Sequence, residues 1–116
     1  MLKTKFDVIY DETIAANNTT ITLSPIVPDG KTIRLTKFGG FDPIGSDNTA
    51  SIIALYWGNN TTGWKLVRAG GMGIFDFQWN PGKDYQGNGS NRFRLIRQNR
   101  SPDNKPLAVW LEALIL

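Results

Sequence analysis

The 116-residue sequence contains no cysteine and no histidine. Without cysteine, the chain has no disulfide scaffold, no zinc–thiolate site and no thiol nucleophile. Without histidine, it lacks the commonest general base and the commonest metal ligand. Its serines fall at turns and strand ends, so no serine-based triad is visible. We therefore expect a protein that is not an enzyme and that uses no cofactor or metal.

Long apolar runs are also missing. No stretch approaches the ~18 apolar residues that a membrane helix needs. The residues after Met1, LKTKFDVIY, lack the apolar core of a signal peptide. We therefore expect a protein made in a cytoplasm, with no membrane partner and no secretion by a signal peptide.

Helical periodicity is absent as well. No stretch of ten residues has an apolar stripe at i, i+3 and i+4 that is free of glycine and proline. Short segments rich in β-branched and aromatic residues, separated by turn sequences, instead predict eight strands. These expected strands cover 4–10, 19–24, 31–38, 50–57, 64–68, 72–79, 92–99 and 106–116. The pattern favours a single all-β domain over 1–116, an antiparallel β-sandwich of jelly-roll type. An immunoglobulin-like sandwich is the alternative, although the Cys…Trp…Cys core is missing.

Turn sequences predict how these strands are joined. GNNTTG (58–63) predicts a hairpin, and RSPDNK (100–105) predicts a second, closing hairpin between the last two strands. GGFDPIGSDN (39–48) and NPGKDYQGNGSN (80–91) are predicted as long loops. Asp42, Asp47 and Asn48 in the first loop carry oxygen ligands of the kind that bind calcium, but their spacing fits no EF-hand.

Basic residues exceed acidic ones by only 13 to 10, and four arginines lie close together near the end of the chain. In a strand, Arg92 and Arg94 share one face, and Arg97 takes the opposite face. This split weakens a single phosphate-binding patch, so we expect no nucleic acid partner. Arginine suits protein interfaces, and charge can also protect a sheet edge from indiscriminate pairing.

The last expected strand, PLAVWLEALIL (106–116), is apolar on both faces. One face can fill the core, and the other needs a cover such as a loop, a sheet edge or a neighbouring subunit. We therefore predict a homo-oligomer. Its protein interface is predicted to include Arg92, Arg94, Arg97, Arg100 and Trp110.

Two tryptophans flank the GNNTTG turn and suggest an alternative function. Trp57 and Trp64, with Asn59 and Asn60 between them, could form a sugar-stacking platform in a carbohydrate-binding module or lectin-like domain. The competing interpretation is that the indoles cap the end of the core.

Three segments carry a resemblance to a known group of proteins. They are VPDGKTIRLTKFG (27–39), SIIALYWG (51–58) and the ending RFRLIRQNRS…LAVWLEA (92–113). The chain resembles the small all-β structural proteins of tailed bacteriophages, namely head decoration (cement) proteins and tail- or neck-associated sandwich modules. This resemblance implies a virion protein made in the host cytoplasm. It also implies assembly, commonly as a symmetric homo-oligomer, on a major capsid or tail protein, with no catalytic residues to transfer.

Overall fold

The computed structural model describes residues 4–43, 51–71 and 73–116, with side chains described from Thr13 onward. Every regular element in these ranges is a strand. The strands are β1 (Thr4–Ile14), β2 (Thr19–Leu23), β3 (Thr32–Asp42), β4 (Ile52–Asn59), β5 (Gly63–Gly70), β6 (Gly73–Gln86), β7 (Arg92–Gln98) and β8 (Lys105–Ile115).

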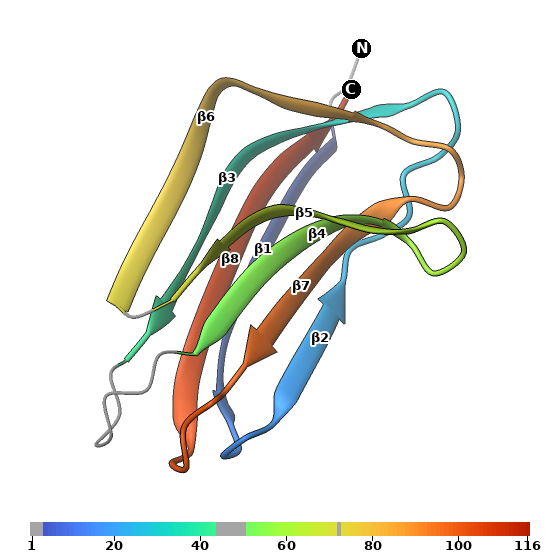
Figure 1. Cartoon of the computed structure of the whole chain (residues 1–116). Coiled ribbons are helices and arrows are strands. Elements are labelled where there is room, and N and C mark those ends of the chain that lie inside the picture. Colours follow the sequence, from blue (N-terminus) through green and yellow to red (C-terminus); the bar gives the residue numbers. More distant parts are fainter. Residues whose placement is uncertain (1–3, 44–50, 72) are drawn as a thin grey trace.

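The eight strands form two antiparallel four-stranded sheets that face each other (Figure 1). The first sheet has the order β1-β8-β3-β6, and the second has the order β2-β7-β4-β5. Apart from the β4–β5 link, every connection between consecutive strands crosses from one sheet to the other. This strand order is that of a jelly roll, so the predicted fold class is confirmed.

The predicted hairpin between β4 and β5 is confirmed, whereas the predicted closing hairpin between the last two strands is wrong. Asn59 pairs with Gly63 at the tip of the β4–β5 ladder. The last two strands, in contrast, belong to different sheets: β7 pairs with β2 and β4, whereas β8 pairs with β1 and β3. The segment between β7 and β8 therefore crosses one end of the sandwich instead of forming a two-stranded turn.

The prediction of a long loop over 80–91 is also wrong for most of its length, because β6 continues to Gln86. The strand pairs with β3 on both sides of an irregularity: Lys37 lies opposite Gln78, and Leu35 lies opposite Lys83. Thr36 is therefore matched by four residues of β6, which include Pro81 and Gly82. A long bulge of this kind accommodates residues that an unbroken ladder excludes.

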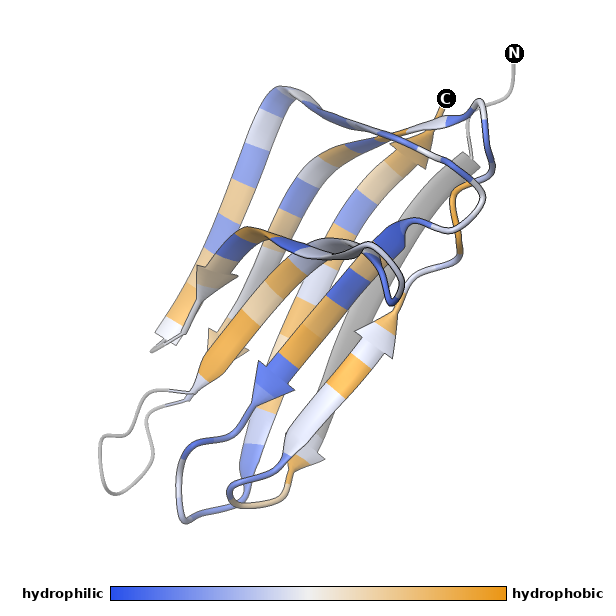
Figure 2. Cartoon of the chain, turned by 45° about the vertical axis from the view of Figure 1, so that its right-hand side comes forward, coloured by the Kyte–Doolittle hydropathy of each residue, from blue (hydrophilic) through white to orange (hydrophobic). Residues whose placement is uncertain are grey.

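The inner faces of the two sheets form one apolar core. Its fully buried side chains come from both sheets, for example Leu35 and Val109 from the first and Leu55 and Phe93 from the second. The period-two alternation appears as coloured bands along the strands in Figure 2, most clearly along β7. The core positions the outer faces of both sheets as two rigid, opposed surfaces.

A buried ion pair lies at the end of β3. Asp42 and Lys105 are 3.2 Å apart (Oδ1 to Nζ), with side-chain exposures of 1% and 3%. Asp42 also accepts a hydrogen bond from the backbone N–H of Ser51 through Oδ2, at 2.8 Å. Asp42, which was considered as a calcium ligand, thus neutralises a buried lysine. The other two candidate ligands, Asp47 and Asn48, lie outside the described residues.

Candidate functional site

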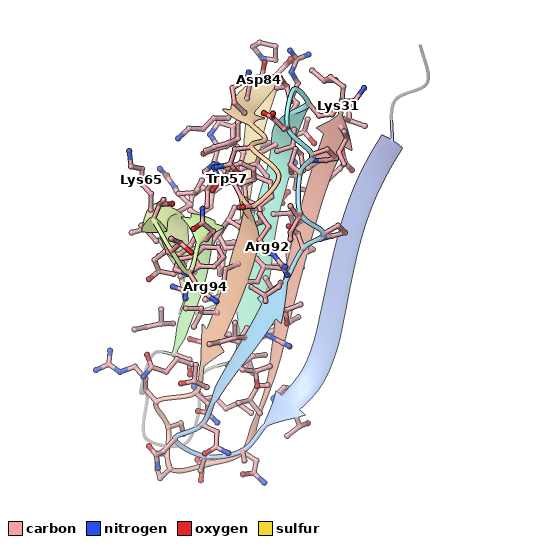
Figure 3. The ribbon with its side chains drawn as sticks, turned by 90° about the vertical axis from the view of Figure 1, so that its right-hand side faces the viewer. Lys31, Trp57, Lys65, Asp84, Arg92 and Arg94 are labelled. Carbon is pink, nitrogen blue, oxygen red and sulfur yellow. The ribbon has the colours of Figure 1, made fainter. Side chains whose placement is uncertain are left out.

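The five residues predicted as an interface do not lie on one surface. Arg92 and Arg94 point outward from β7, on the outer face of the second sheet (Figure 3). Arg97 is 1% exposed and lies inside the sandwich, where its Nη1 donates to the carbonyl of Leu107 at 2.9 Å. Arg100 is exposed in the β7–β8 connection, and Trp110 lies on the outer face of the first sheet. The structure therefore brings together only the first two.

The burial of Arg97 follows from the strand alternation. Phe93, Leu95 and Arg97 occupy every second position of β7, and all three are buried. A buried guanidinium is tolerated only with hydrogen-bond partners, and the main-chain carbonyl of Leu107 is one of them. Arg97 therefore acts within the fold and is not accessible to a partner.

Arg94 is held by aromatic rings. Its Cζ lies 4.4 Å from the ring centroid of Trp64 and 5.0 Å from that of Tyr56. Its Nε is buried and has no hydrogen-bond partner among the described residues. The cation thus bridges β7, β4 and β5 on the outer face through cation–π contacts, which are strongest where water is excluded.

Exposed apolar side chains surround the stack that Arg94 forms with Trp64 and Tyr56. Ile21 and Leu23 of β2 are 55% and 47% exposed, and Leu66 of β5 is 55% exposed. Register places Leu23 opposite Arg94 and Leu66 opposite Tyr56, so all of them share the outer face. We call this surface the basic face; it comprises Ile21, Leu23, Tyr56, Trp64, Leu66, Arg92, Arg94 and Ile96.

The apolar side of β2 faces outward, which the sequence did not reveal. The sequence predicts a strand over 19–24, and the burial of β2 does alternate along it. However, Thr20 and Thr22 are the less exposed residues, whereas Ile21 turns toward solvent. An edge strand with its apolar side exposed is a feature that soluble proteins usually avoid unless a partner covers it.

The two sheets differ sharply in charge. The strands of the second sheet hold five basic residues and no aspartate or glutamate. The strands of the first sheet hold five basic and seven acidic residues. Neither Arg92 nor Arg94 pairs with a carboxylate in the part of the chain that the structure describes. The basic face therefore presents cations and apolar groups without internal neutralisation.

The outer face of the first sheet has the opposite character. Trp110 lies across Gly39, where a Cβ atom would overlap the indole, and its Nε1 donates to Asp76 Oδ1 at 2.9 Å. Beside this pair, Ile74 is 75% exposed and Phe41 is 41% exposed, and the two are register partners. We call this surface the acidic face; it comprises Lys37, Phe41, Ile74, Asp76, Ala108, Trp110 and Glu112. Lys37 is the register partner of Glu112 and acts electrostatically on Asp76, so the face holds a lysine beside its carboxylates.

The Trp110 hydrogen bond should be measurable through acid titration. It lowers the pKa of Asp76 below its ordinary value, with smaller contributions in the same direction from Gln78 and Lys37. A depressed carboxyl pKa contributes stability that is present above the unfolded pKa of ~3.9 and is lost as pH falls through the folded pKa. Trp110→Phe should therefore raise the pKa of Asp76, as followed by NMR titration of its carboxyl carbon. Gln78→Ala should raise it less, and an unchanged pKa in Trp110→Phe would contradict the assignment.

The proposed sugar-stacking residues have separate roles. Trp57 packs on the inner face, 4.9 Å from Phe93 and 5.1 Å from Tyr85 between ring centroids. Asn59 is 9% exposed, and its Oδ1 accepts from two backbone N–H groups of the turn at 2.8 Å. Asn60 Oδ1 accepts from Trp64 Nε1 at 3.1 Å. Both tryptophans nevertheless line one hollow of about 330 Å³ at the hairpin end.

Neither a metal site nor a membrane helix is found in the described ranges. Those residues include no group of three or more acidic, histidine or cysteine side chains that could hold an ion. They also form no helix of the length and hydropathy needed to cross a membrane.

The two faces are thus defined by geometry and charge alone. The strand order is shared by viral capsid domains, lectins and cupins, so fold by itself does not select a function. Comparison with known proteins adds no further constraint: no protein-family model matches the chain, and neither a curated protein nor a solved structure does.

Proposed function

We propose that this chain is a non-enzymatic structural protein of a bacteriophage virion, which assembles by protein–protein contacts on a capsid or tail. The observation that supports the proposal is the basic face, where Ile21, Leu23 and Leu66 are each about half exposed around the Arg94 stack. Arginine and aromatic residues are enriched in protein interfaces, and a contiguous exposed apolar surface marks an interaction site. The sequence resemblance to phage decoration and tail modules supplies the virion context.

The proposal predicts stable incorporation into particles. In purified phage particles, quantitative mass spectrometry should find the chain at a fixed ratio to the major capsid or tail protein. Leu66→Asp should lower incorporation at least tenfold, because it places a carboxylate in the apolar part of the contact. Lys31→Asp, an exposed charge change in the β2–β3 connection, is the matched control and should incorporate normally. Absence of the wild-type chain from particles would reject the proposal.

A carbohydrate-binding role is the second candidate, and the hollow that Trp57 and Trp64 share favours it. Indole faces stack on the apolar faces of sugar rings. Trp64→Ala should abolish oligosaccharide binding and leave the fold intact, because Trp64 lies on the outer face. Trp57 is unsuitable for this test, since its loss would also disturb the core. A glycan array without any bound sugar would reject this candidate.

A further inference from the structure

We propose that the partner of the basic face is the acidic face of a second copy, so that copies of this chain stack head to tail. This inference rests on the proposed function and specifies one of its contacts. It makes the two outer surfaces of the sandwich complementary halves of one repeating interface.

A symmetric contact between two basic faces is disfavoured by charge. Such a contact would bring Arg92 and Arg94 of both copies together, and the four strands of that sheet offer no carboxylate to neutralise them. Like charges that are brought together in a desolvated interface oppose association. The partner surface must therefore supply carboxylates from elsewhere.

The acidic face supplies them beside apolar groups. Asp76 and Glu112 lie on this face together with Lys37, and Glu112 already accepts a hydrogen bond from Thr36. Asp76 is therefore the main carboxylate offered to the arginines; it is exposed, and its orientation is fixed by Trp110 and Gln78. The exposed Ile74 and Phe41 continue the surface, next to a hollow of about 240 Å³ lined by Phe41, Pro43, Pro106 and Ala108. Carboxylates next to an apolar recess are the complement of arginines next to exposed isoleucine and leucine.

The position of the two faces sets the form of the assembly. They are the opposite outer surfaces of one two-layered sandwich (Figure 1), so a contact between them uses different residues on each copy. A contact of this heterologous kind repeats from copy to copy, giving a closed ring or an open stack. The charge component predicts that association weakens as salt increases.

Two face-blocked variants test this arrangement. Arg92→Glu with Leu66→Glu alters only the basic face, and Ile74→Arg with Asp76→Asn alters only the acidic face. Sedimentation velocity of the wild type should show salt-sensitive association beyond the monomer. Each double variant alone should stay monomeric, with a dissociation constant raised at least tenfold, while its thermal melting confirms a folded chain. An equimolar mixture should form dimers, because each variant retains one intact face.

Other outcomes overturn the inference. If the acidic-face variant still dimerises alone, the contact is symmetric. If the wild type stays monomeric but binds a 20-nucleotide poly-dT strand, the basic face serves nucleic acid. If the wild type stays monomeric and is nevertheless present in particles at a fixed ratio, the partner is another virion protein. In that last case the head-to-tail contact fails and the proposed function stands.

Discussion

Replacing Lys105 with methionine should lower the free energy of unfolding by about 3 to 5 kcal/mol. The substitution keeps much of the side-chain volume but removes the cation that faces Asp42 at 3.2 Å. Both side chains are almost fully buried, so the carboxylate would be left in the interior without this countercharge. Urea unfolding followed by tryptophan fluorescence measures the loss, and the melting temperature should fall by on the order of 10 °C or more.

A double variant separates charge from packing. Asp42→Asn retains an oxygen that can accept from the Ser51 N–H, and combined with Lys105→Met it leaves no charge at this position. The double variant should recover most of the stability lost by Lys105→Met, because replacing a whole buried pair by neutral groups is often close to neutral. A single-variant loss below about 1 kcal/mol would show that water reaches the pair in solution.

Replacing Phe93 with alanine should have an effect of similar size, about 3 to 5 kcal/mol. Phe93 is fully buried, and its ring centroid lies 4.9 Å from that of Trp57 and 5.4 Å from that of Tyr85. The three rings join β4, β6 and β7 across the two sheets. Alanine would leave a cavity that strands held in two ladders cannot close. Denaturant unfolding at neutral pH measures the loss.

Tyr85→Phe is the control within the same cluster. The Tyr85 hydroxyl is buried and has no hydrogen-bond partner among the described residues. Its removal should leave the free energy of unfolding unchanged or raise it, because a buried unsatisfied hydroxyl is itself destabilising. A clear loss in Tyr85→Phe would mean that a water or a residue outside the described ranges satisfies the hydroxyl.

Alternation of residue types was enough to predict the strands and the fold class. In RFRLIRQ, the alternation places Arg97 on the same face as Phe93 and Leu95, although Arg97 was predicted as an interface residue. The same alternation does not show which face of a strand packs against the opposite sheet. Ile21 therefore reads as a core residue, although pairing of β2 with β7 turns it outward. Which face of a strand points into the core depends on how that strand pairs within its sheet, and the local sequence does not encode this pairing.

Pairing between sheets explains the remaining differences. The last two strands look like a hairpin because they are close in sequence, and proximity is the usual guide to pairing. In a jelly roll, however, strands that are consecutive in sequence mostly lie in opposite sheets. The predicted interface of five residues was therefore divided between an outer face, the core, a connection and the second outer face. Only Arg92 and Arg94 remain neighbours, since they are two apart on one strand.

The pairing of β1 with β8 has a consequence for biosynthesis. All eleven residues of β1 are in register with β8, from Thr4 opposite Ile115 to Ile14 opposite Lys105, and β1 has no other neighbour in its sheet. β8 also separates β1 from β3, so β1 cannot join the first sheet before β8 is available, whereas β3 and β6 can pair without it. β1 must therefore wait until Lys105–Ile115 has been translated. Since contacts this distant in sequence form slowly, on the order of milliseconds to seconds, the first sheet should close only after β8 has left the ribosome.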